Sequence, residues 1–144
     1  MDNVDPIAAH YGAERELAAA DLQSGERVEA GAIGLQPRSR GKGLLARLAN
    51  ARPRAYRLVL TDRRLLVYRG ASLRPGAGRL ERALPWHQVR RAELVLGERF
   101  HELTLLTAEG DLRYALPRTE SDAGHLQQVL RRVVSALNVR LAES

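Results

Sequence analysis

Residues 56–68 read Tyr-Arg-Leu-Val-Leu-Thr-Asp-Arg-Arg-Leu-Leu-Val-Tyr, and this stretch decides the fold of the chain. Its first half alternates large apolar side chains with an arginine and a valine, which is the period of two that is typical of a β-strand. Residues 61–64 supply a polar turn, and residues 65–68 return as a second apolar strand. Two such runs joined by a short polar turn predict a β-hairpin, and therefore an antiparallel sheet.

The same alternation recurs on both sides of this hairpin. We expect further strands at residues 26–35, 80–84, 92–96, 100–107 and 112–116. Glycine, proline and polar residues separate these runs, as turns between short strands require. Seven short strands at close spacing predict an antiparallel barrel or sandwich.

Helical patterns stand at the two ends of the chain. Residues 5–21 begin with Asp5 and Pro6, a capping residue and a residue suited to the first helical position, and they are rich in alanine. At the other end, residues 121–138 carry apolar side chains along one predicted helical stripe, namely Leu126, Leu130, Val133, Val134 and Leu137. We expect this amphipathic helix to cover an open end or face of the barrel, because the stripe must be buried.

Length and composition exclude several classes of protein. The chain has 144 residues and no cysteine, so it is one domain without disulfides, thiol nucleophiles or zinc sites built on cysteine. No apolar run approaches the roughly 20 residues of a membrane span. The first residues are acidic where a secretion signal would be basic, so we expect a cytoplasmic protein.

The positive charge is concentrated in the middle of the chain. The formal net charge is +6, but residues 38–91 hold fifteen bases against two acids, whereas both flanks are net acidic. Residues 38–57 contain no acid at all and seven bases: Arg38, Arg40, Lys42, Arg47, Arg52, Arg54 and Arg57. Clustered charge of one sign creates a local field that attracts anionic partners.

Three stretches carry a resemblance to a known family. Residues 22–28 read Leu-Gln-Ser-Gly-Glu-Arg-Val, the hairpin contains Leu-Thr-Asp-Arg-Arg-Leu at 60–65, and residues 84–89 read Leu-Pro-Trp-His-Gln-Val. They resemble the G-E-x-V, L-T-x-x-R-L and I-P-x-x-x-I motifs of bacterial pleckstrin-homology-like (PH-like) domains and the related GRAM domains. The resemblance covers about residues 22–139.

This resemblance implies a fold that is mainly β with α, a seven-stranded antiparallel β-barrel or sandwich capped by a C-terminal amphipathic helix. It divides the chain into an N-terminal helical extension, 1–22, and a PH-like domain, 23–140, whose first two strands are joined by a long basic connection at 36–53. It implies no catalysis and no cofactor. Members of the family bind lipids, peptides or each other.

The basic connection is the candidate binding site. The lipid-binding members of the family carry the motif Lys-x(n)-(Lys/Arg)-x-Arg, and Lys42, Arg52 and Arg54 fit its spacing, although Pro53 interrupts it. We therefore predict an anion-binding role for all seven bases of residues 38–57. Three leucines of the connection are candidates for contact with the membrane boundary: Leu44, Leu45 and Leu48. The alternatives are a solvated loop, or leucines that fold back onto the barrel or onto a neighbouring subunit.

Two functions follow from these patterns. The first is a non-enzymatic adaptor, peripheral at the inner face of the membrane, that docks to an anionic membrane surface or an acidic protein partner. The second is a homo-oligomeric scaffold without lipid binding, in which Val129, Ala136 and Leu141 contact another subunit. Nucleic acid ranks lower, because Tyr56 is the one aromatic residue in the basic window and stacking needs several.

Catalytic and metal-binding motifs are incomplete. His101-Glu102 begins like the zinc motif H-E-x-x-H, but Leu105 stands where the second histidine belongs and the segment reads as a strand. Gly41-Lys42-Gly43 lacks the remaining residues of a phosphate-binding loop. The sequence therefore predicts neither an enzyme nor a metal or cofactor site.

Overall fold

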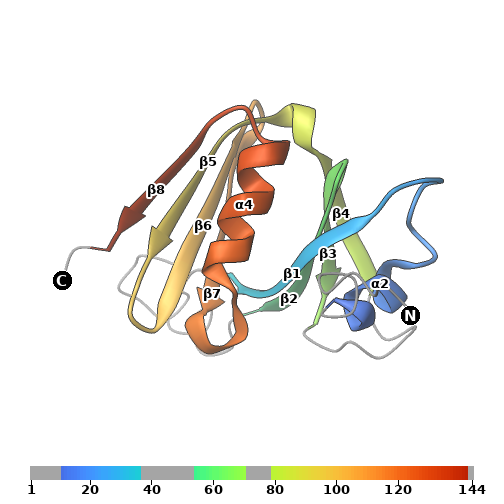
Figure 1. Ribbon diagram of the computed structural model, residues 1–144, viewed down its shortest axis with the longest axis horizontal. Helices are drawn as coiled ribbons and strands as arrows, with labels where there is room; N and C mark the ends of the chain where they lie inside the picture. Colours follow the sequence, from blue (N-terminus) through green and yellow to red (C-terminus); the bar gives the residue numbers. More distant parts are fainter. Residues whose placement is uncertain (1–10, 37–53, 71–78, 143–144) are drawn as a thin grey trace, which may run out of the picture.

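The computed structural model describes residues 11–36, 54–70 and 79–142 of the chain (Figure 1). Eight strands form most of it: β1 Val28–Leu35, β2 Ala55–Thr61, β3 Arg64–Arg69, β4 Arg79–Pro85, β5 Val89–Leu96, β6 Phe100–Thr107, β7 Gly110–Pro117 and β8 Leu137–Leu141. The described α-helices are α2, Gly12–Ala18, and α4, Ala123–Val133. Two single-turn 3₁₀ helices, η1 Trp86–Gln88 and η2 Arg118–Glu120, complete the described elements.

The strands form one sheet in the order β4-β3-β2-β1-β7-β6-β5-β8. All neighbours are antiparallel except β5 and β8, which are parallel. β1 and β7 pair through Leu35 and Ala115 alone, so the sheet divides there into two halves. Figure 1 shows α4 in the angle between these halves, where it covers the inner faces of both. This arrangement confirms the predicted hairpin of β2 and β3 and the mainly β architecture.

The core lies between the inner faces of the two halves and α4. β2 and β3 contribute Leu58, Leu60 and Leu65, all fully buried, and α4 contributes Leu126 and Leu130. Full burial of one such side chain stabilises the fold by about 1.5–3 kcal/mol. Asp122 fixes the start of α4, because its Oδ1 accepts a hydrogen bond from the His125 backbone N–H at 3.0 Å.

The outer face of the hairpin is buried as well. Val59 and Leu66 form a cross-strand pair on that face, and both are fully buried although they point away from α4. The segment from α2 to β1 covers them, and the Tyr68 hydroxyl donates a hydrogen bond to Asp21 Oδ2 at 2.8 Å. Burial on both faces explains why the second strand of the hairpin is continuously apolar.

The C-terminal helix is shorter than predicted, and an eighth strand follows it. The sequence predicts a helix over 121–138, whereas α4 ends at Val133 and Val134 adopts an extended backbone conformation. Leu137–Leu141 then pairs with β5, and the Ala92 N–H donates to the Ala136 carbonyl at 2.9 Å. Pairing with an exposed edge of β5 outweighed the local helical pattern, so the predicted count of seven strands is wrong. β4 and β8 remain as the two edges of the sheet.

The structure also corrects the predictions for Val129 and for the N-terminal helix. Val129, proposed as a subunit contact, is fully buried in the core on the inward face of α4. The predicted N-terminal helix, 5–21, is observed as Gly12–Ala18, with residues 1–10 outside the described part. Within the described ranges, neither α-helix has the length and apolar character needed to cross a bilayer.

Candidate functional site

Most of the predicted basic site lies outside the described residues. This applies to Arg38, Arg40, Lys42, Arg47 and Arg52, and to the leucines Leu44, Leu45 and Leu48. The two ends of the connection are described, and they lie side by side, because the Gln36 N–H donates to the Arg54 carbonyl at 3.0 Å. The connection therefore leaves and re-enters the sheet at one place, the shared end of β1 and β2.

The last two bases of the predicted site are separated by the structure. Arg54 is exposed beside the start of β2. Arg57 is buried, and its Nη1 lies 3.6 Å from Glu14 Oε1 of α2, with both side chains only 10% exposed. A buried guanidinium needs such a partner, since an isolated buried charge is strongly destabilising. Arg57 therefore holds α2 on the sheet and is removed from the candidate surface.

Gly31 makes this ion pair possible. It faces the same side of the sheet as Arg57, and a Cβ atom at this position would lie 2.5 Å from Glu14 Cγ. A side chain at residue 31 would therefore displace the Glu14 carboxylate. The sequence pattern placed Arg57 among the predicted anion-binding bases, and it contained no signal that a helix covers this face of β2.

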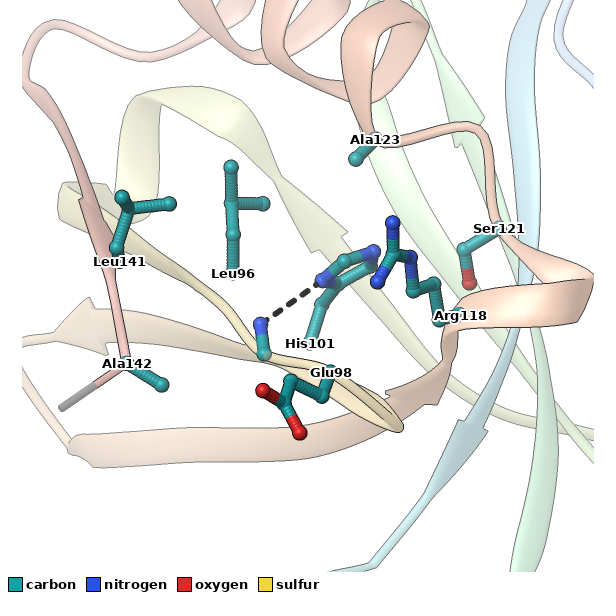
Figure 2. Close-up of a pocket in the computed structure, with 9 residues that line it drawn as sticks. Leu96, Glu98, His101, Arg118, Ser121, Ala123, Leu141 and Ala142 are labelled. Carbon is teal, nitrogen blue, oxygen red and sulfur yellow. Dashed lines mark hydrogen bonds between the residues drawn. The ribbon is translucent and has the colours of Figure 1, made fainter. Parts of the chain in front are cut away.

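Two hollows lie in the described surface. The larger, about 750 Å³, is called here the β8 pocket (Figure 2), and its lining includes Leu96, Glu98, His101, Arg118, Ala123 and Leu141. The smaller, about 380 Å³, is called here the β1–β2 cleft, and its lining includes Tyr56, Glu81, Arg82, Asp111, Arg113 and Tyr114. Gln36 also lines the cleft, so the basic connection begins at its margin.

The β1–β2 cleft has aromatic walls and a charged rim. Tyr56 and Tyr114 meet edge to face with ring centroids 5.9 Å apart, and burial raises the pKa of the Tyr114 hydroxyl. At the rim, Arg113 Nη2 lies 4.0 Å from Asp111 Oδ2, which is a weak, exposed pair. Arg82 is exposed, and no described carboxylate lies within ion-pair distance of it.

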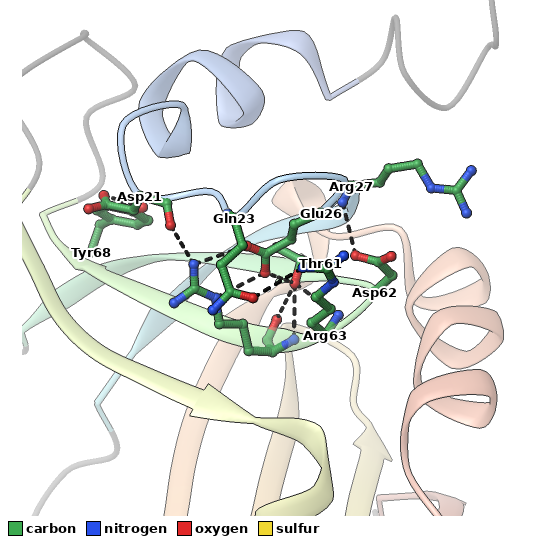
Figure 3. Close-up of polar contacts among 9 residues, drawn as sticks. Asp21, Gln23, Glu26, Arg27, Thr61, Asp62, Arg63 and Tyr68 are labelled. Carbon is green, nitrogen blue, oxygen red and sulfur yellow. Dashed lines mark hydrogen bonds and ion pairs between the residues drawn. The ribbon is translucent and has the colours of Figure 1, made fainter.

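A second polar cluster joins the N-terminal segment to the hairpin (Figure 3). The side chain of Glu26 is fully buried, and Arg64 binds both of its oxygens at 2.9 Å through Nη2 and Nε. The Thr61 hydroxyl donates to Glu26 Oε2 at 2.6 Å, and the Gln23 N–H donates to Oε1 at 2.9 Å. The indole N–H of Trp86 donates to the Thr61 carbonyl at 2.8 Å.

These hydrogen bonds set the ionisation of Glu26. Burial by itself raises the pKa of the carboxyl, but the hydrogen bonds from Arg64 and Thr61 outweigh it and lower the pKa to about 2. Glu26 is therefore a carboxylate whose acceptor positions are occupied by the protein. Its environment suits a structural role, because a catalytic base or a ligand site needs an open position. The hydrogen-bonded cluster of Glu26, Thr61, Arg64 and Trp86 is called here the polar clasp.

The clasp is built from the three stretches that carry the family resemblance. Glu26 belongs to the first, Thr61 and Arg64 to the second, and Trp86 to the third. The motif pattern indicated a strand order, but it gave no reason for these residue types. The structure supplies that reason, since each residue makes a hydrogen bond that fixes the start of β1 against the hairpin and η1.

Metal-binding chemistry finds no support in the described ranges. They contain no group of three or more histidine and carboxylate side chains placed to hold an ion. His125 serves the fold, because its Nε2 lies 2.6 Å from the Glu29 carbonyl and its ring stacks on Tyr11 with centroids 5.5 Å apart.

Comparison with known proteins identifies the class of fold. No protein-family model matches the sequence, and no curated protein is similar to it. The hSac2 domain from the human phosphoinositide phosphatase Sac2 is similar in structure, with a TM-score of 0.53 and 12% identity over 99% of this chain and 93% of that chain. A pleckstrin homology domain from Shewanella amazonensis SB2B has a TM-score of 0.50 and 13% identity, over 94% of this chain and 93% of that chain.

A DUF1696 family protein with a pleckstrin-homology domain, from Shewanella loihica PV-4, has a TM-score of 0.49 and 13% identity and covers 93% of this chain and 100% of its own. The class of fold is assigned from the similarity to the Shewanella amazonensis pleckstrin homology domain. The chain therefore has a PH-like fold. At these identities the likeness extends to the fold alone.

Proposed function

We propose that this chain is a non-catalytic PH-like domain that docks onto an anionic membrane surface through the basic connection between β1 and β2. The observation that carries the proposal is the acid-free run of bases between β1 and β2, in a connection whose flanking residues Gln36 and Arg54 are hydrogen-bonded to each other, with Gln36 at the margin of the β1–β2 cleft. Because Arg57 is buried, the proposed site consists of the other six bases of residues 38–57: Arg38, Arg40, Lys42, Arg47, Arg52 and Arg54.

The charge is sufficient for such docking. A basic residue near an anionic bilayer contributes about 1 kcal/mol, so several together support binding that weakens as salt is added. Leu44, Leu45 and Leu48 would add apolar energy if they enter the headgroup boundary. Arg82 adds one further cation at the rim of the cleft that Gln36 also lines. Docking of this kind would place the chain peripherally at the inner face of a membrane.

Vesicle co-sedimentation tests it. The probes are vesicles of phosphatidylcholine alone and of phosphatidylcholine with phosphatidylserine, each at low and high salt. We expect binding to the anionic vesicles only. The affinity for these vesicles should fall at least about tenfold in the quadruple variant Arg38→Gln, Arg40→Gln, Arg52→Gln and Arg54→Gln.

A matched variant separates local charge from net charge. The control variant changes four arginines that are exposed on β5, α4 and β8 or in the β5–β6 turn: Arg90, Arg99, Arg131 and Arg140. Their change to glutamine removes the same total charge from other places, and it should leave most of the binding intact. Equal loss in both quadruple variants, or equal binding to both vesicle types, would contradict docking through the connection.

A homo-oligomeric scaffold is the second candidate, and one observation favours it. Leu141 is 75% exposed on the edge strand β8, and Phe100 is 47% exposed at the start of β6. An apolar side chain on an open sheet edge is a means of association between copies. Light scattering on a sizing column would show a multimer that Leu141→Ser dissociates and the arginine variants leave intact.

A further inference from the structure

The β8 pocket is a second candidate site, independent of the proposed membrane docking. It shares no lining residue with the β1–β2 cleft. Its volume of about 750 Å³ falls within the range of about 300–1,000 Å³ that is usual for sites of small molecules. Apolar side chains from β5, α4 and β8 form much of its wall, including Leu96, Ala123 and Leu141.

His101 is a polar residue in an apolar row. The inward-facing positions of β6 are His101, Leu103 and Leu105, and all three are buried, His101 with 5% exposure. Because the Gly97 N–H donates to His101 Nδ1 at 3.2 Å, the ring proton of the neutral histidine is on Nε2. The structure gives Nε2 no partner among the described residues, and Figure 2 shows it directed into the pocket beside Arg118.

The β5–β6 turn fixes this orientation. A Cβ atom at Gly97 would lie 2.2 Å from the Phe100 carbonyl oxygen, so only glycine fits the turn. Gly97 thereby keeps its N–H directed at the imidazole of His101. A buried imidazole that is held by one nitrogen and open at the other is prepared to donate a hydrogen bond to a ligand.

Arg118 provides the charge of the pocket. Its backbone N–H donates to the Arg99 carbonyl at 3.0 Å, which fixes η2, and its guanidinium has no described carboxylate within ion-pair distance. Glu98 also lines the pocket, but Figure 2 shows its carboxylate directed away from Arg118 and His101. The Ser121 hydroxyl is already used, because it donates to the Pro117 carbonyl at 2.8 Å.

The charge state of the pocket selects the ligand. Burial, and then the nearby charge of Arg118, lower the pKa of His101, so the imidazole is neutral at physiological pH. Arg118 therefore contributes the single cationic charge, and His101 one neutral N–H donor. A guanidinium is shaped to bind a carboxylate through two parallel hydrogen bonds. One positive charge beside apolar walls matches a monoanion with an apolar body better than a doubly charged phosphate.

We propose that the β8 pocket binds a small monocarboxylate with an apolar chain. The carboxylate accepts hydrogen bonds from His101 Nε2–H and the Arg118 guanidinium, and the apolar chain lies along Leu96 and Leu141. The start of α4 at Ala123 adds the positive end of a helix dipole to the same wall.

Calorimetry with the full chain tests the proposal. The probe is octanoate, with acetate as the head group alone and 1-octanol as the chain alone. We expect saturable binding of octanoate, and binding at least about tenfold weaker for each of the other two, because each lacks one half of the recognition. Equal affinity for octanol and octanoate, or no saturable binding of octanoate, would overturn the proposal.

Two variants and one spectrum locate the binding. Arg118→Gln should weaken octanoate at least about tenfold, whereas Arg131→Gln, the same loss of charge on an exposed part of α4, should leave it unchanged. His101→Leu continues the apolar row of β6 and should lower the affinity for octanoate without lowering that for octanol. In the unmodified chain, octanoate should shift the His101 Nε2 nitrogen resonance, and an unmoved resonance would refute the assignment.

Discussion

Replacement of Glu26 by glutamine tests the polar clasp most directly. The variant keeps the volume of the side chain but removes the charge that compensates Arg64, whose guanidinium lies 2.9 Å from the carboxylate. The pKa of Glu26 falls from an ordinary 4.5 to about 2, and each unit corresponds to about 1.4 kcal/mol. We therefore expect Glu26→Gln to lower the free energy of unfolding by about 3 kcal/mol at pH 7.

The pH dependence gives a second, independent readout. The folded-state pKa lies below the unfolded value, so the unfolded chain binds more protons between pH 4.5 and about 2. The stabilisation is complete above about pH 5 and decreases as the pH falls through this window. Glutamine does not titrate, so the difference between the two proteins should be about 3 kcal/mol at pH 7 and should shrink toward zero near pH 2.

Urea unfolding followed by tryptophan fluorescence measures both quantities, because Trp86 lies in the clasp. Glu16→Gln, at an exposed position of α2, is the control for loss of one negative charge. A loss below about 1 kcal/mol for Glu26→Gln, or a difference that stays constant from pH 7 to pH 2.5, would refute the reasoning.

Three further substitutions test the packing of the fold. Gly31→Ala places a Cβ where it collides with Glu14, and it should lower the unfolding free energy in urea by about 1–3 kcal/mol, whereas Gly12→Ala, which meets no atom within 4 Å, should not. Gly97→Ala should cost about 1–3 kcal/mol and move the His101 Nδ1 resonance, and an unchanged resonance would contradict the role given to this turn. Trp86→Phe removes the hydrogen bond to the Thr61 carbonyl and should lower the thermal midpoint by an amount equivalent to about 1 kcal/mol; no change would show that the bond contributes nothing.

The sequence predicted the elements whose pattern is local. The hairpin of β2 and β3 was predicted because alternation of side chains, a polar turn and a second apolar run lie within thirteen consecutive residues. The helix that became α4 was predicted from its amphipathic stripe, and the structure shows that it begins after Asp122, whose side chain caps it. The resemblance to PH-like domains was carried by motifs that the structure shows to be mutual hydrogen-bond partners.

The candidate site was predicted only in part. The charge cluster of residues 38–57 is visible in the sequence, but the exposure of each base is not, and Arg57 is buried against Glu14. His101 was dismissed as a ligand because no zinc motif surrounds it. Its role in the β8 pocket depends on Arg118, seventeen positions away, and on Gly97, neither of which belongs to a recognisable motif with it.

The sequence by itself therefore predicted seven of the eight strands and the helix that follows them, since periodicity records which side each residue faces. It could not determine what covers each face. Only the tertiary structure decided that α2 buries the outer face of the hairpin, that Leu137–Leu141 leaves the helix to pair with β5, and that His101 opens into a pocket. The physical reason is that burial and strand pairing arise between segments far apart in the chain, where local pattern carries no information.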